Sequence, residues 1–191
     1  TYRALYPTLH HMAQAMAEFG RPGWLPRFPA LRIDDAGLAG QVRAVQGAIG
    51  AGAAPIERES RWLALLTTLV QRYGSDRLTL PAAGAEPRAV ARARAYIEAH
   101  YAERVTLAAL AADVGLSPFH LVRVFRRAAG VPPHVYLDSV RIRHAQHMLA
   151  AGTPLAEVAY ATGFSSQSHF TSRFRQIIGV TPGAFRGGMS G

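Results

Sequence analysis

The chain repeats one stretch of its own sequence about 49 residues further on. One copy starts at Ala111 and reads AADVGLSPFHLVRVFRRAAGVPPHVY. The other starts at Ala159 and reads AYATGFSSQSHFTSRFRQIIGVTPGAF. The offset is 48 up to the paired glycines, Gly115 and Gly163, and 49 from the following serines onward. A repeat of this kind requires the fold to build one supersecondary unit twice.

The repeated unit has the pattern of a helix-turn-helix. Two helices that cross steeply around a short turn need a small residue where they touch, and Ala111 and Ala159 supply it. The turn needs a residue that accepts a positive φ, which Gly115 and Gly163 do. The spacing therefore predicts helix-turn-helix units over 106–129 and 154–178. Their inner sides would be filled by Leu107, Leu110, Val114, Leu116, Leu121, Val124, Leu155, Val158, Phe164, Phe170 and Phe174.

Helical spacing extends along most of the chain. Leu38, Val42, Val45 and Ile49 fall on one face of a helix that ends at Gly50. A second helix is predicted over 55–73, with an apolar stripe too wide for a lone surface helix. The two helices form either a hairpin within one chain or the seam of a homodimer, because both arrangements bury the same pattern.

The stretch 78–87, rich in Pro, Gly and Ala, has no helical period and predicts a linker between regions 1–77 and 88–186. Ser, Thr or Pro residues at helix starts and Gly residues at helix ends divide the second region. We expect helices there over 90–102, 106–114, 117–129, 133–151, 154–162 and 166–178. Residues 9–19 form a further candidate helix before the hairpin.

The positive charge is concentrated in the repeat-bearing half. All 21 basic side chains are Arg, and the net charge is +9. Residues 87–191 hold twelve Arg and five acids, a net charge of +7. A basic domain with this pattern favours nucleic acid as a partner. The competing interpretation is an ordinary helical bundle with two similar hairpins.

The residue content also excludes several classes of function. Without Cys the chain has no disulfide, no thiolate metal site and no cysteine nucleophile. No catalytic triad or nucleotide-binding motif is present, so neither an enzyme nor a cofactor is predicted. The pair His10 and His11, and the pair His144 and His147, lack a third ligand, so no metal site is predicted. Apolar runs are far shorter than the roughly 18 residues of a membrane span, which favours a soluble, cytoplasmic protein.

The repeat resembles the DNA-binding domain of the AraC/XylS family of bacterial transcription regulators. The second copy, from Ala159 to Arg186, carries the resemblance most closely, and residues 88–186 follow it throughout. The resemblance implies a mainly α fold with two helix-turn-helix units joined by a long linker helix. Residues 1–75 more loosely resemble the tail of a regulatory domain: the end of a β-barrel around Tyr2 to Tyr6, then dimerisation helices. The first residue is not Met and most of such a barrel is absent, so we expect a fragment.

The resemblance implies how the two units read double-stranded promoter DNA. The linker helix, about 28 Å long, would place two recognition helices in major-groove segments about 34 Å apart. Arg suits guanine, amides suit adenine, and apolar groups suit the thymine methyl. The predicted base-reading residues are Phe119, Val122, Arg123, Gln167, Ser168 and Ser172. Phe119 has an alternative role as a core aromatic.

Phosphate contacts are expected from helix starts and from further Arg side chains, because helix N-termini and guanidinium groups both attract anions. The predicted residues are Thr106, Ser117, Arg126, Ser166, Arg173 and Arg175. The family relationship implies RNA polymerase as a second partner and transcriptional activation as the outcome. It leaves open a small-molecule effector for the full-length protein, and residues 1–75 as a ligand-sensing module form the alternative function.

Overall fold

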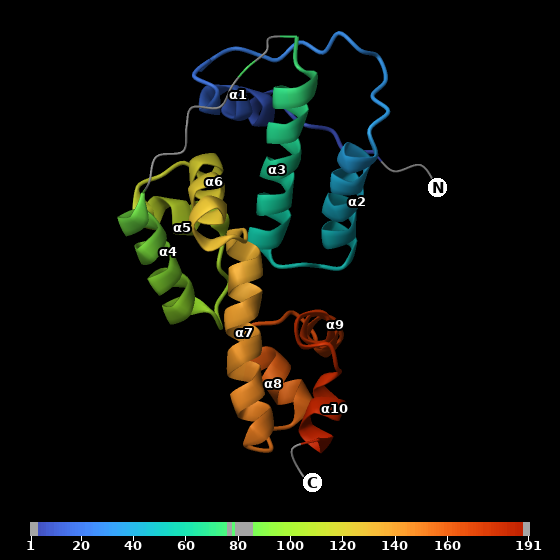
Figure 1. Ribbon diagram of the computed structural model, residues 1–191, viewed down its shortest axis with the longest axis vertical. Coiled ribbons are helices and arrows are strands. Elements are labelled where there is room, and N and C mark those ends of the chain that lie inside the picture. The colour runs from blue at the N-terminus through green and yellow to red at the C-terminus, as the bar shows by residue number, and fades with distance from the viewer. Residues whose placement is uncertain (1–3, 76–77, 79–85, 189–191) are drawn as a thin grey trace.

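The computed structural model describes residues 4–75, 78 and 86–188, and this part of the chain is helical without β-strands. The N-terminal helices are α1 (Leu9–Glu18), α2 (Ala36–Gly50) and α3 (Pro55–Tyr73). The C-terminal helices lie along the molecule from the middle of Figure 1 to its lower end. They are α4 (Pro87–His100), α5 (Leu107–Val114), α6 (Pro118–Ala129), α7 (Pro133–Ala150), α8 (Leu155–Ala161), α9 (Gln167–Ile178) and α10 (Pro182–Gly187).

The predicted helix boundaries agree with the structure because local signals set them. Thr106, Ser117 and Ser166 cap α5, α6 and α9, each by accepting a hydrogen bond from the backbone N–H three residues on. Gly115 and Gly130 end α5 and α6 in the left-handed conformation. The largest difference is in the helix expected over 90–102, which begins at Pro87, since proline is well suited to a first helical position, and ends at His100.

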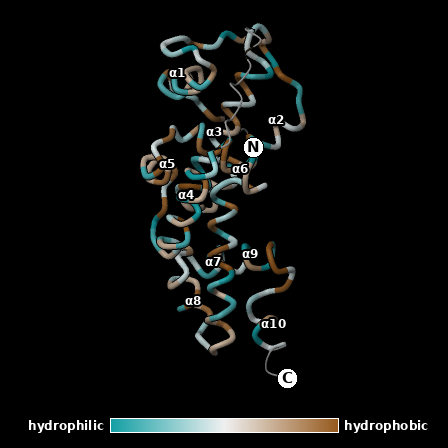
Figure 2. The backbone as a smooth tube through the Cα atoms, turned by 60° about the vertical axis from the view of Figure 1, so that its left-hand side comes forward, coloured by the Kyte–Doolittle hydropathy of each residue, from teal (hydrophilic) through white to brown (hydrophobic). Residues whose placement is uncertain are grey.

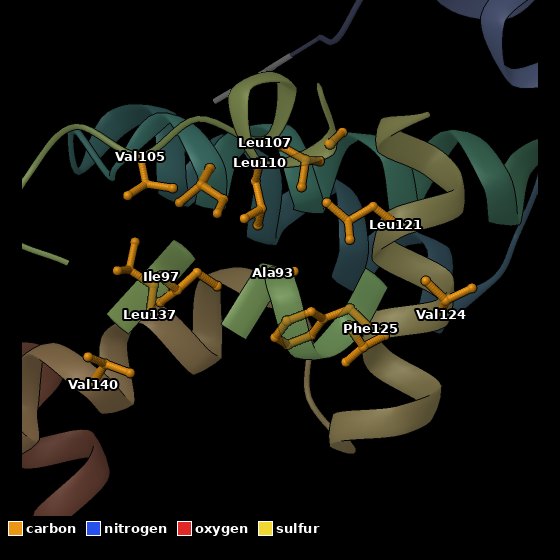
Figure 3. Packing of buried hydrophobic residues seen from close by; sticks show 13 residues of the cluster. Ala93, Ile97, Val105, Leu107, Leu110, Leu121, Val124, Phe125, Leu137 and Val140 are labelled. Carbon is orange, nitrogen blue, oxygen red and sulfur yellow. The ribbon is translucent and has the colours of Figure 1, made fainter. Parts of the chain in front are cut away.

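Two apolar cores lie on opposite ends of helix α7. The larger joins α4, α5 and α6 to the first half of α7, and Figure 3 shows their side chains pointing into one shared space. The smaller packs α8, α9 and α10 around Ile142, Ala145 and Leu149 in the second half of α7. The predicted inner residues of both units lie in these cores. Helix α7 is therefore a common strut, and the mainly α fold with two helix-turn-helix units is confirmed.

Helices α2 and α3 pack against each other as a hairpin within one chain. Leu38 and Val45 of α2 are buried against Leu65 of α3, with Leu69 and Tyr73 packed around them. The opposite side of α3 contacts α1, α5 and α7. The hairpin and these contacts account for the wide apolar stripe without a second chain.

The resemblance also predicted the end of a β-barrel around Tyr2 to Tyr6. Residues 1–3 lie outside the described residues, and residues 4–8 are not in a strand. This prediction is wrong for residues 4–6, which have no neighbouring strand to supply the ladder hydrogen bonds that hold a β-strand in place. Most of the linker predicted over 78–87 also lies outside the described residues.

Apolar residues are spread along all helices and alternate with polar ones, as Figure 2 shows. Within the described part of the chain, no single helix is long and apolar enough to cross a membrane. Among the described helices, α5 and α6 together reach the required length and composition, as a pair bent by 82°. The apolar faces of this pair are buried in the larger core.

A buried arginine joins the two units at the middle of α7. Arg141 is 2% exposed. Its Nε donates to the Tyr101 carbonyl at 2.8 Å, and a terminal nitrogen donates to the Glu103 carbonyl at 2.9 Å. Its guanidinium also lies over the ring of Phe164, 5.6 Å from the centroid. Arg141 therefore connects the end of α4 to the turn of the second unit.

Gly163, in that turn, has no room for a side chain. Its φ is +80°, and a Cβ would come within 2.8 Å of the Ala102 carbonyl oxygen and 2.9 Å of the Tyr101 carbonyl oxygen. Gly152 has a similar φ of +84°, but a Cβ there would meet open space. A side chain at Gly152 would therefore cost only the strain of the backbone conformation, whereas a side chain at Gly163 would also cost a steric clash.

We expect Gly163→Ala to destabilise the fold more than Gly152→Ala. The left-handed conformation alone costs an L-residue about 1–2 kcal/mol, and only Gly163→Ala adds a clash with fixed backbone atoms. Urea unfolding of both variants measures the difference. Equal losses of unfolding free energy would contradict the close packing at Gly163.

Candidate nucleic-acid interface

The start of helix α9 presents the polar side chains predicted to read bases in the second unit. Ser166 caps the helix by accepting the His169 N–H at 3.1 Å. Gln167, Ser168 and Ser172 are exposed on one side of the helix. They line an open hollow of about 950 Å³, together with Thr171, Arg175, Gln176 and Thr181. The predicted base readers of this unit and Arg175 therefore share one accessible polar surface.

The inner side of α9 is packed into the smaller core. Phe170 and Phe174 are fully buried and contact each other edge to face. His169 is half-buried with its ring edge against Phe164, and burial lowers its pKa below the ordinary value. Because the inner residues are buried in the smaller core, the helix presents Gln167, Ser168 and Ser172 to solvent.

The first recognition helix, α6, is less accessible. Val122 and Arg123 are half-buried, and Arg126 is exposed. Phe119 is only 6% exposed and packs against Ala15, Met16, Phe19, Leu66 and Val70 of the N-terminal region. In this structure Phe119 is a core aromatic, which was its alternative role, and it faces no solvent from which to read a base.

The helix starts predicted to hold phosphate in the first unit already have anionic partners. The Thr106 hydroxyl accepts the Ala109 N–H at 3.1 Å, and the adjacent Leu107 N–H donates to the Glu59 carboxylate at 2.7 Å. The Ser117 hydroxyl donates to the Glu18 carboxylate at 2.5 Å. Both acids come from the N-terminal region, which the sequence did not connect to these positions.

Arg173 differs from its prediction as a phosphate contact. Its side chain is 16% exposed and forms ion pairs with Glu57 of α3 and with Asp138 of α7, the latter at 3.3 Å. Arg61 also pairs with Glu57, at 2.9 Å. Arg173 points inward because it lies on the side of α9 that faces α7, away from Ser172. It therefore joins α3, α7 and α9 in an ionic cluster.

The ionic cluster shifts the titration of its members. Burial raises the pKa of Asp138 to about 6, and burial lowers the pKa of the neighbouring His134 to about 4. Burial also acts to raise the pKa of Glu57, but Arg173 and Arg61 hold it below its ordinary value. At neutral pH the cluster therefore contains charged carboxylates and a neutral histidine.

The described residues gather no set of three His, Cys, Asp or Glu side chains suited to a metal. Two of the four histidines considered as ligands, one from each pair, contact aromatic rings. His144 stacks on Tyr101 with ring centroids 3.9 Å apart. His11 completes a capping box with Thr8 and meets the ring of Trp62 edge on.

Replacing Asp138 by Asn should make stability depend more steeply on pH in weak acid. Because the pKa of Asp138 is raised in the folded chain, this residue adds to the free energy of unfolding fully below about pH 4. That contribution is lost as pH rises through about 6. The lowered pKa of His134 contributes stability that is full above pH 6.5 and is lost as pH falls through about 4. In the wild-type chain these two pH-dependent contributions to the free energy of unfolding largely cancel between pH 4 and pH 6. Asp138→Asn removes one of them, so the contribution of His134 becomes measurable.

Relative to the wild-type curve, Asp138→Asn should lose up to about 1.4 kcal/mol per pH unit as pH falls from about 6 to about 4. Urea unfolding at three pH values in this range measures the loss. Asp34→Asn, at a carboxylate 76% exposed, is the matched control. Parallel curves for Asp138→Asn and wild type would contradict the raised pKa.

The chain is similar in sequence to known helix-turn-helix proteins. Residues 110–188 match a family model described as a helix-turn-helix domain. YbfI, an uncharacterized HTH-type transcriptional regulator of Bacillus subtilis, is 32% identical over 88% of this chain and 61% of its own length. The HTH-type transcriptional activator RhaS of Escherichia coli is 34% identical over 51% of this chain and 35% of its own length. The chain thus spans less than two thirds of either relative.

A crystal structure matches the same architecture. It is a transcriptional regulator from Chromobacterium violaceum described by its AraC-type DNA-binding domain, 28% identical with a TM-score of 0.52. The match covers 55% of this chain and 94% of that one, so the shared part is essentially one domain. The two helix-turn-helix units on α7 agree with that description. The C-terminal domain of this chain is therefore an AraC-type helix-turn-helix domain.

Proposed function

We propose that the chain binds double-stranded promoter DNA at a specific sequence and thereby regulates transcription. Helices α6 and α9 act as recognition helices in two adjacent segments of the major groove. The observation that carries the proposal is the exposed polar side of α9, where Gln167, Ser168 and Ser172 lie beside Arg175. This surface combines amide and hydroxyl groups suited to base edges with a cation suited to phosphate.

The spacing of the two units supports one chain reading both segments. Helix α7 has 18 residues and so measures about 27 Å, and it carries one unit at each end. Successive major grooves on one side of a duplex lie about 34 Å apart. We therefore propose an asymmetric site of roughly two helical turns, with no dimer required for its recognition.

The relatives support activation as the outcome. RhaS, by its name, is a transcriptional activator. We propose that this chain also activates transcription when bound, by contact with RNA polymerase. An in vitro transcription assay on a promoter that carries the bound sequence tests this, and loss of transcript on addition of the protein would indicate repression instead.

Selection of binding sites from random duplex DNA tests the DNA-binding proposal. We expect enrichment of an asymmetric motif of about two helical turns. Binding that falls steeply with salt and enriches no motif would show attraction to any polyanion and would overturn sequence-specific regulation.

Gln167→Ala should relax the preference for one base within the selected motif. An amide makes a paired contact with adenine, and its loss costs about 1–3 kcal/mol of discrimination at that base. Repeating the selection with the variant measures the change. Gln71→Ala, the same replacement at an exposed position of α3, is the control. An unchanged preference profile would remove Gln167 from the set of base readers.

Arg175→Ala should weaken binding to all sequences alike, because a phosphate contact carries no sequence information. The slope of log affinity against log salt should become shallower by about one. Titrations of the selected site and of an unrelated duplex at four salt concentrations measure both effects. Arg43→Ala, at an exposed position of α2, is the control. A loss confined to the selected site would show instead that Arg175 reads bases.

A further inference from the structure

The two units differ in what covers their recognition helices. Helix α1 packs on α6 and on α3, and it lies beside α6 at the upper end of the molecule in Figure 1. Phe119 of α6 is part of an apolar cluster. Its partners are Met16 of α1, Phe19 directly after α1, and Leu66 and Val70 of α3. In the part of the chain that the structure describes, the predicted reading side of α9 has no such cover and lines the open hollow described above.

Acidic side chains of the N-terminal region occupy the first unit at the places where phosphate would bind. Glu18 accepts the hydroxyl proton of Ser117, the N-cap of α6. Glu59 accepts the Leu107 N–H at the start of α5. A helix start attracts anions through its free N–H groups, so a carboxylate placed there takes the position of a phosphate oxygen. The first unit thus carries both an apolar cover and two anionic substitutes for DNA.

The contact between α1 and the first unit is not tightly filled. A half-open groove of about 440 Å³ lies between α1, α3, α5 and α6, bordered by Glu18, Glu59, Trp62 and Phe119 among others. Close packing is what makes an interior hard to separate, and a void forfeits part of that attraction. Helix α1 has only 10 residues, and residues 21–35 after it form no helix. These features allow α1 to leave α6 while the two cores around α7 stay intact.

We propose that α1 and α3 mask the first recognition helix, so that in this arrangement only the second unit engages DNA, and that α1 must leave α6 before both units bind. The proposal rests on the proposed function, since it concerns the same DNA surface. Displacement of α1 releases Ser117 from Glu18 and removes Met16 and Phe19 from Phe119, whereas Glu59 of α3 stays at the start of α5. The masked and unmasked forms therefore differ in footprint as well as in affinity.

A reversible crosslink between α1 and α6 tests the masking. The chain has no Cys, so Glu18→Cys with Ser117→Cys introduces a unique pair at two side chains in contact. A short dithiol-reactive crosslinker that reductant removes holds the pair closed. We expect the crosslinked protein to bind the selected two-turn site at least about 10-fold more weakly and to protect only one half of it from hydroxyl-radical cleavage. Reductant should raise the affinity of the same sample by that factor and give it the full footprint, and the reduced form is the reference because Ser117 is itself a predicted phosphate contact.

A second crosslinked pair controls for the chemistry. Gln41→Cys with Thr68→Cys joins α2 to α3, where the native side chains are 3.2 Å apart, and should leave DNA binding unchanged. An equal affinity and a full footprint for the crosslinked and reduced forms of the α1–α6 pair would overturn the masking alone. Failure of both forms, and of the wild-type chain, to select any DNA would overturn the proposed function and the masking with it.

A single substitution tests the same idea without a crosslink. Glu18→Ala removes the acceptor of Ser117 and should tighten binding to the two-turn site about fivefold, the ratio that one hydrogen bond typically supplies. Asp34→Ala removes the same charge from an exposed position of the N-terminal region and should not. Equal affinities for Glu18→Ala, Asp34→Ala and wild type would count against the masking.

Discussion

The buried guanidinium of Arg141 is the contact on which the arrangement of the two units depends. It satisfies carbonyl groups where α4 ends and lies over Phe164 in the turn of the second unit. Burying a cation costs free energy that hydrogen bonds offset, so the two carbonyl acceptors of Arg141 favour one arrangement of the chain around it. Gly163 belongs to the same junction, since its lack of a side chain lets that turn approach the Tyr101 and Ala102 carbonyls. The spacing between α6 and α9 follows from this junction and from the length of α7.

The N-terminal helices use two different kinds of contact with the two units. Helix α3 reaches the second unit through the ionic cluster of Glu57, Arg173 and Asp138, which lies on the inner side of α9. It reaches the first unit, together with α1, through the apolar cluster around Phe119, on the side of α6 that we propose to read DNA. The first kind of contact supports a recognition helix from behind, and the second covers one from the front. A regulator built in this way can hold both units in register and still control one of them.

A large part of the fold could be predicted from the sequence, because short-range signals determine it. The repeat, the Ser and Thr caps, the glycine ends and the apolar spacing each act within a few residues, and they predicted the helices of the C-terminal region. They also predicted which residues fill both cores. The accessible candidate surface on α9 followed from the same helical spacing, since it lies opposite Phe170 and Phe174.

What the sequence by itself determined is therefore the two units, the strut between them and the basic character of their surface. Only the tertiary structure decided which predicted contact residues are accessible. Phe119 and Ser117 meet α1 about 100 residues earlier in the chain, and Arg173 meets Glu57 at a separation of 116 residues. Helical periodicity records which side of a helix a residue occupies but not which distant element packs there. Burial and ion pairing across such distances depend on how whole helices dock, and that is a property of the assembled chain.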